Sequence, residues 1–186
     1  FHTGADTTHK QTSNELRYAG RFFDRMDLTV GFYYYTDEKF YQENRFLLGG
    51  FRTFFGGGKQ DSRNLGVFGQ VELDLTDRFS LIGGGRWTSE RKDVILTNLT
   101  LSPTACIVTV TCPVHFIDEK TWKNFTPKVG FRWAATDEMN VYGHWTQGVR
   151  SGGYNFRNTS VVFPIERFDE ETVDSFEVGF KATPSG

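Results

Sequence analysis

The strongest constraint on the fold is a strict alternation of apolar and polar residues between Leu65 and Trp87, in the stretch LGVFGQVELDLTDRFSLIGGGRW. Before the polar turn 76–78, every second residue is apolar or glycine, and the positions between them include Glu72 and Asp74. The same period of two resumes after the turn. Because side chains alternate between the two faces of a strand, this pattern predicts a long antiparallel hairpin with one apolar and one largely polar face.

The length of the two arms indicates their surroundings. Each arm runs about ten residues or more, whereas strands of soluble proteins average about five or six. A strand tilted across a bilayer needs roughly nine to eleven residues. The hairpin alone suits a soluble β-sandwich as well as a membrane-spanning sheet. Whether the pattern repeats along the chain distinguishes the two.

The alternation recurs along the whole sequence. Five further stretches show it: 14–22, 28–35, 125–135, 139–146 and 175–182. Short polar turns are expected near residues 24, 76 and 136, and long connections at 36–63, 90–120 and 148–170, with a loop from Phe1 to Ser13. Short turns at one end and long loops at the other are typical of a transmembrane up-and-down barrel.

The predicted fold is therefore all-β: an antiparallel up-and-down transmembrane β-barrel segment of about seven strands. Single-chain bacterial barrels use even strand numbers from eight upward, so we expect the chain to be part of a longer protein that completes the cylinder. A mean hydropathy of −0.45 is compatible with this, since half of each strand faces a polar lumen. A net charge of −2 without a basic patch gives no indication of nucleic acid.

Two cysteines, Cys106 and Cys112, lie in the second long connection, between Pro103 and Pro113. Their spacing suits a small disulfide-closed loop, which would place this loop in an oxidising compartment. A pair of free thiols is the alternative. Zinc is not expected, because only His115 lies nearby to complete a ligand set.

Three stretches resemble one family. Residues 140–155, NVYGHWTQGVRSGGYN, resemble a strand and loop of TonB-dependent outer-membrane receptors, and residues 168–183, FDEETVDSFEVGFKAT, resemble the strand that follows it. Residues 124–143 are similar to the hairpin that precedes this loop, and weaker similarity covers 14–20 and 67–93. The three motifs occur in the order that the family shows.

The resemblance implies a barrel of about 22 strands, filled by an amino-terminal plug and energised through TonB. It implies a location in the outer membrane of a Gram-negative bacterium and uptake of a scarce nutrient, such as an iron-siderophore complex. Residues 1–186 would be a partial barrel domain, and the plug and the TonB-contacting segment are not expected within this stretch. Its partners would be the outer-membrane lipid, its own plug and remaining strands, TonB and a small-molecule ligand. No cofactor is expected.

Candidate functional residues fall into two groups. Arg150, Tyr154, Asn155 and Arg157 begin an outer loop, where a mixture of aromatic and polar side chains could contact ligand. The second group comprises charges on the predicted polar face, which would line the lumen: Glu72, Arg86, Lys128, Arg132, Glu177 and Lys181.

Catalysis is not expected, because the sequence contains neither a GxSxG nor an HExxH motif and its carboxylate pairs fall in turns or loops. Two non-enzymatic alternatives stay open at this point. A passive outer-membrane porin would show the same strands, and a soluble all-β carbohydrate-binding or adhesion module could share the alternation.

Overall fold

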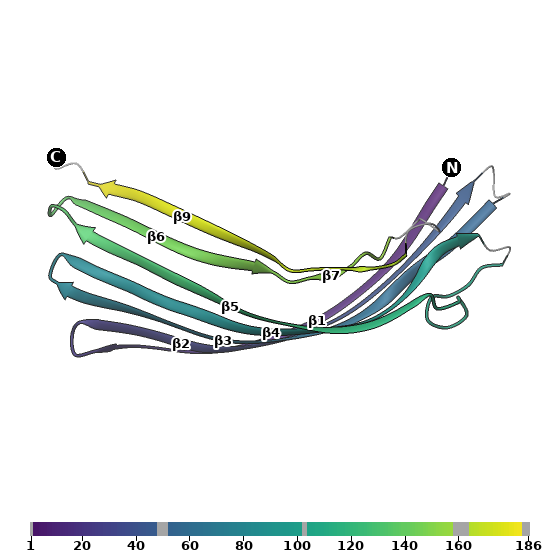
Figure 1. The fold of residues 1–186 in the computed structure, drawn as a ribbon, viewed down its shortest axis with the longest axis horizontal. Helices are drawn as coiled ribbons and strands as arrows, with labels where there is room; N and C mark the ends of the chain where they lie inside the picture. Colours follow the sequence, from purple (N-terminus) through teal and green to yellow (C-terminus); the bar gives the residue numbers. More distant parts are fainter. Residues whose placement is uncertain (1, 48–51, 102–103, 158–163, 184–186) are drawn as a thin grey trace.

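The computed structural model describes residues 2–47, 52–101, 104–157 and 164–183. Seven strands form one antiparallel sheet in the order β1-β2-β3-β4-β5-β6-β9, so sequence neighbours pair throughout. Figure 1 shows them side by side in a single curved sheet. The strands are β1 (His2–Phe22), β2 (Met26–Leu47), β3 (Arg52–Thr76), β4 (Phe79–Leu101), β5 (Phe116–Ala134), β6 (Met139–Arg150) and β9 (Glu171–Ala182). A separate two-stranded ladder pairs β7 (Gly153–Tyr154) with β8 (Arg167–Phe168).

The short turns lie where the sequence predicts them, at one end of the sheet (Figure 1). They follow β1, β3 and β5, and the first holds Phe23 and Asp24 at positive φ. The opposite end carries the connections that contain the cysteines and the β7–β8 ladder. Within the described residues, no helix is long and apolar enough to cross a membrane.

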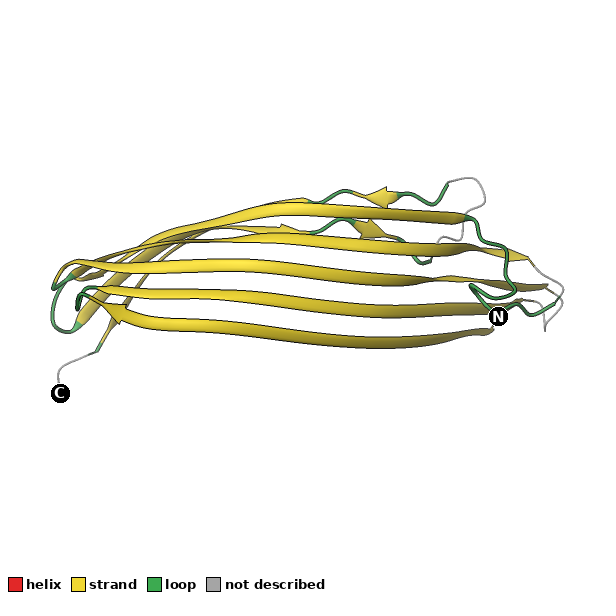
Figure 2. Cartoon of the chain, turned by 90° about the horizontal axis from the view of Figure 1, so that it is seen from below, coloured by secondary structure: helices red, strands yellow, loops and turns green. Residues whose placement is uncertain are grey.

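The strands themselves are longer than the sequence indicates (Figure 2). The predicted loop from Phe1 to Ser13 is wrong, because β1 already begins at His2. The predicted loops 36–63 and 90–120 are wrong over most of their length, since β2 continues to Leu47, β3 starts at Arg52 and β4 continues to Leu101. At about 3.3 Å per residue, the 25 residues of β3 span roughly 80 Å, far more than a bilayer requires.

The register confirms the predicted facing of the strands. On one face, hereafter the apolar face, Val71 lies between Leu28 and Gly83, and Val129 lies opposite Trp145. Each pairing therefore places apolar or glycine positions side by side across all seven strands. Many of these side chains are solvent-exposed in the isolated sheet, among them Val178, which is 79% exposed. An exposed apolar surface of this extent requires a cover, and a lipid bilayer provides one.

The apolar face has the height of a bilayer. It extends along β3 from Leu65 to Leu75, which is about 33 Å of strand. At a tilt of about 40° this corresponds to a band roughly 25 Å high, the height of the apolar band in outer-membrane barrels. The parts of β1 to β5 beyond this band, residues 2–13, 35–47, 52–64, 90–101 and 116–122, are hereafter the extension.

Two small hydrophobic clusters lie in the extension. One contains Val94, Leu96, Trp122, Tyr154 and Ile165, so it joins the sheet to the β7–β8 ladder. The other packs Val108 of the cysteine loop, which is fully buried, against Phe55 and Phe40. Both clusters fasten a connecting segment to the sheet, one on each face.

Candidate functional site

The segment between β6 and β9 folds back over the polar face of the extension. Its described residues, 151–157 and 164–170, are hereafter the strap. The predicted long connection 148–170 is thus largely confirmed, but it holds the short β7–β8 ladder and crosses the sheet instead of extending away from it. Its attachments reach from β5 to β2.

The strap is first fixed where it leaves β6. Lys92 of β4 donates hydrogen bonds to Ser151 Oγ at 2.8 Å and to the Gly152 carbonyl at 2.6 Å. Gly152 lies so close to the Trp122 indole that an added Cβ would stand 2.7 Å from it. Glycine at this position therefore allows the backbone to pack directly on the ring.

The second attachment is Tyr154, which is only 7% exposed. Its hydroxyl donates to Asp118 Oδ2 at 2.9 Å, and Arg167 reaches the same oxygen at 3.3 Å. Burial, reinforced by the hydrogen bond to Asp118, raises the pKa of the Tyr154 phenol. The ring packs edge-on against Trp122. Both arms of the strap are thus tied to one carboxylate of β5.

The third attachment is the most buried charge of the site. Glu43 of β2 is 1% exposed and accepts hydrogen bonds from Arg45 at 2.6 Å and from Tyr41 at 2.7 Å. Arg157 of the strap adds two, at 3.1 and 3.2 Å. Burial alone would raise the pKa of Glu43, but the hydrogen bonds from Arg157, Arg45 and Tyr41 outweigh it and lower the pKa to about 2. Glu43 is therefore a carboxylate that anchors the strap.

The structure separates the four predicted ligand contacts. Tyr154 and Arg157 attach the strap to the sheet, and the Asn155 side chain accepts a hydrogen bond from the Arg157 backbone at 3.0 Å. Arg150 lies at the end of β6, where it pairs with Glu171 at 3.5 Å and stacks over Phe168. A role of any of the four in ligand binding stays a prediction.

Sequence reasoning missed the residues that receive the strap. Glu43, Lys92 and Asp118 all lie in stretches that were expected to be loops. In a loop, a single charged residue does not indicate a buried contact. Phe156 was also missed, although Lys39 stacks over its ring with Nζ 5.1 Å from the centroid. These residues bring cations and an aromatic ring together at the long-loop end of the polar face.

The predicted wall charges do lie on the polar face. Arg132 pairs with Glu72 at 2.6 Å, and Lys128 donates to Gln70 at 3.2 Å. The Arg86 guanidinium lies 5.1 Å above the Tyr33 ring. His144 and Glu177 approach to 3.9 Å, and Lys181 lies over Tyr142. These contacts give a polar wall of mixed charge.

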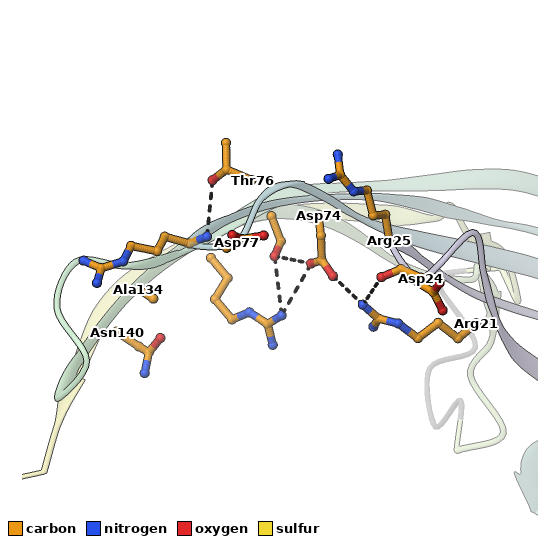
Figure 3. Close-up of a pocket in the computed structure, with 11 residues that line it drawn as sticks. Arg21, Asp24, Arg25, Asp74, Thr76, Asp77, Ala134 and Asn140 are labelled. Carbon is orange, nitrogen blue, oxygen red and sulfur yellow. Dashed lines mark hydrogen bonds and ion pairs between the residues drawn. The ribbon is translucent and has the colours of Figure 1, made fainter.

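A second polar cluster occupies the same face at the short-turn end (Figure 3). Arg21 reaches Asp74 at 2.8 Å and also the Asp24 carbonyl at 2.6 Å. Ser80 donates to the other oxygen of Asp74 at 2.6 Å. Strands β1, β3 and β4 are thereby linked through one carboxylate below the first turn.

The cysteine loop lies on the opposite face of the extension, and a disulfide joins Cys106 to Cys112. The loop is fastened to the sheet by the Gln42 side chain, which accepts from the Val108 backbone at 3.2 Å, and by Thr97, which donates to the Pro113 carbonyl at 3.0 Å. In the described part of the chain, no three His, Cys, Asp or Glu side chains come together as metal ligands would.

Comparison with known proteins gives the family. The family model described as "TonB dependent receptor-like, beta-barrel" matches residues 1–186. Among curated proteins, none matches the sequence significantly.

Two solved structures have the same architecture. The ferric yersiniabactin uptake receptor FyuA from Yersinia pestis superposes with a TM-score of 0.80 at 18% identity, covering 98% of this chain and 27% of FyuA. The copper transporter OprC superposes with a TM-score of 0.69 at 14% identity, covering 98% of this chain and 29% of OprC. This chain thus spans between a quarter and a third of each of these proteins, and at such identities the likeness shows the fold alone.

The family consists of outer-membrane receptors of Gram-negative bacteria, whose barrels place an apolar band toward lipid and a polar face toward the lumen. Both properties match the two faces described above, and the match of the family model extends over the whole chain. The chain belongs to the TonB-dependent receptor-like β-barrel family.

Proposed function

We propose that this chain forms part of the barrel wall of an outer-membrane receptor that takes up a scarce nutrient, such as a ferric siderophore, with energy supplied through TonB. Residues 1–186 then belong to the barrel domain. The edge strands β1 and β9 pair with further strands of a cylinder of about 22, and a plug elsewhere in the protein fills the lumen.

The observation that carries this proposal is the strap across the polar face. In a closed barrel the polar face lines the lumen, so the strap narrows the mouth from one side. It brings Arg157, Phe156 and Lys39 to the same region. Cations beside an aromatic ring suit a ligand that is anionic and partly aromatic or apolar, as many metal chelates are.

The two structural neighbours carry different substrates, so the ligand of this chain is inferred from its own residues. FyuA is an uptake receptor for ferric yersiniabactin, and OprC is a copper transporter. An iron chelate is the proposal favoured here because Arg157 and Lys39 would attract an anionic complex and repel a free metal cation. Arg150 at the end of β6 and the strap residues Tyr154, Asn155 and Arg157 are proposed to hold that ligand at the mouth.

Uptake by the full-length receptor tests the proposal. Iron-starved cells that express the receptor are offered a panel of labelled ferric siderophores and, separately, a copper salt, with and without TonB. We expect saturable uptake of at least one ferric chelate that disappears without TonB. Flux that rises linearly with concentration and ignores TonB would instead identify a passive channel.

Point variants locate the site. Lys39→Gln is expected to weaken binding of the transported chelate to the purified full-length receptor severalfold, because it removes a cation at the mouth. Arg78→Gln is the matched control, since it removes a cation at the short-turn end, where Arg78 pairs with the exposed Asp137. Equal losses of affinity in both variants would contradict the placement of the site.

A further inference from the structure

The outer boundary of the apolar face carries an ordered arrangement of charge. The register places residues of β1 to β5 in rows across the sheet, and the last fully apolar row is Leu16, Phe32, Val67, Trp87 and Phe125. The next row on the same face is Asn14, Tyr34, Leu65, Ser89 and Lys123, and the one after it is Thr12, Thr36, Arg63, Arg91 and Thr121. These two rows contain three cations and no carboxylate.

Carboxylates gather one row further from the apolar band. That row is Lys10, Glu38, Asp61, Asp93 and Glu119. Moving away from the band, the face is therefore first apolar, then cationic, then mainly anionic. A surface that merely faced water would not need this order, because charges of either sign dissolve equally well in it.

The cationic rows bring like charges together. Arg63 and Arg91 are direct cross-strand partners, a placement that destabilises a sheet unless an anion compensates it. Arg91 is compensated within the chain, by Asp93 at 2.8 Å and Glu119 at 2.6 Å. Arg63 interacts electrostatically with Asp93 at longer range, but neither Arg63 nor Lys123 forms an ion pair with any residue that the structure describes, and both are exposed. Their positive charge is thus available to an external anion.

We propose that Arg63 and Lys123, on either side of the internally paired Arg91, form a binding site for the phosphate of an anionic lipid whose acyl chains lie on the apolar face. A lipid phosphate stands at the border of the hydrocarbon layer, which is where these rows lie. Arginine is suited to phosphate, since its planar guanidinium donates two parallel hydrogen bonds. The proposal rests on the outer-membrane location proposed above, and it names a partner for the outside of the wall instead of the lumen.

Trp87 supports the placement. It lies in the last apolar row, two residues along β4 from the Ser89 level and four from Arg91, and is 39% exposed. Tyr34 occupies the row between, at 37% exposure. Tryptophan and tyrosine gather at the interface between hydrocarbon and headgroups because one end of each ring is polar. The cations therefore stand on the headgroup side of an aromatic border.

Lipid titration of the detergent-solubilised full-length receptor, read by native mass spectrometry, tests the site. We expect phosphatidic acid to bind at least about tenfold more tightly than phosphatidylcholine with the same acyl chains, because only the former presents a phosphate monoester. The double variant Arg63→Gln/Lys123→Gln should abolish this preference, since each lost charge-assisted contact weakens binding about tenfold. Neither residue forms an ion pair with the described residues, so folding is expected to be unaffected.

The control removes the same charge from the other face. Lys120→Gln/Lys128→Gln lies on the polar face and should leave the lipid preference unchanged. Equal binding of the two lipids, an equal loss in the control, or full competition by an equal concentration of inorganic phosphate would each overturn the proposal. Failure of the outer-membrane proposal would look different, because the full-length protein would then leave the cell envelope without detergent.

Discussion

Placing an arginine at Val71 is the sharpest test of the two-faced wall. Val71 lies on the apolar face between Leu28 and Gly83, six residues from Leu65 and four from Leu75, the ends of the apolar band on β3. It is therefore close to the middle of the bilayer. An arginine on the lipid face at this depth costs about 2–4 kcal/mol, which corresponds to roughly a 30- to 700-fold change in the folding equilibrium.

Two control variants separate facing from depth. Leu65→Arg lies on the same face at the border of the band, where the cost falls to about 0–1 kcal/mol. Thr29→Arg lies on the polar face of the neighbouring strand, opposite Ala19 and Gln70, and should be tolerated in the lumen. Glu72 is a poorer control than the sequence indicates, because its replacement by arginine would set two guanidinium groups together at Arg132.

The assay is equilibrium unfolding by urea of the full-length receptor inserted in phospholipid vesicles, followed by tryptophan fluorescence and circular dichroism. We expect the order of destabilisation to be Val71→Arg, then Leu65→Arg, then Thr29→Arg. Equal destabilisation by Val71→Arg and Thr29→Arg would refute the assignment of the faces. An equal loss of unfolding free energy in Val71→Arg and Leu65→Arg would refute the proposed height of the apolar band.

Three further predictions concern the long-loop end. Lowering the pH from 7 toward 2 should release the strap, because folding lowers the pKa of Glu43 from 4.5 to about 2. The ionised carboxylate therefore adds up to about 3 kcal/mol to the free energy of unfolding above pH 4.5, and this contribution is lost as the pH falls toward 2. Hydrogen exchange of residues 152–157 should rise at low pH, and Glu43→Gln should raise it already at pH 7. Reducing the Cys106–Cys112 disulfide should lower the free energy of opening the cysteine loop by about 2 kcal/mol, as expected for so small a ring, and so speed amide exchange there. The sheet should stay intact, and global unfolding on mild reduction would be the contrary result. Gly57→Ala should destabilise the extension by about 1–3 kcal/mol, because Gly57 has a φ of 145° and a Cβ there would collide with the Tyr41 carbonyl; an unchanged exchange rate of the surrounding amides would contradict this.

The membrane-spanning half of the fold could be predicted because hydrophobicity reports on it directly. A residue such as Val71 must be apolar to face lipid, and its neighbour Glu72 must be polar to face the lumen, so the period of two is written into the sequence. The register then follows, since a slip by one residue would turn every apolar side chain to the wrong face.

The extension could not be predicted in this way, because both of its faces meet water or polar segments. Residues 2–13 contain hardly any apolar side chain, and the run of glycines at 56–58 is ordinarily a sign of a loop. What makes these residues strands is their pairing with neighbours already aligned by the membrane-spanning half, as in the continuous ladder of His2–Phe22 against β2. Pairing of this kind is a tertiary effect and leaves no local pattern.

The position of the strap follows from the unequal heights of the strands. β1 to β5 have 19 to 25 residues, whereas β6 and β9 have 12 each, so the wall drops abruptly beyond β5. The upper polar face of β5 at Trp122 and Asp118 would then be left without neighbours on that side. The strap fills this step, because Tyr154 covers the indole and bonds the carboxylate. A low section of wall with a folded segment above it makes this end of the sheet asymmetric, and under the proposed function an entering ligand would meet the strap before it meets the lumen.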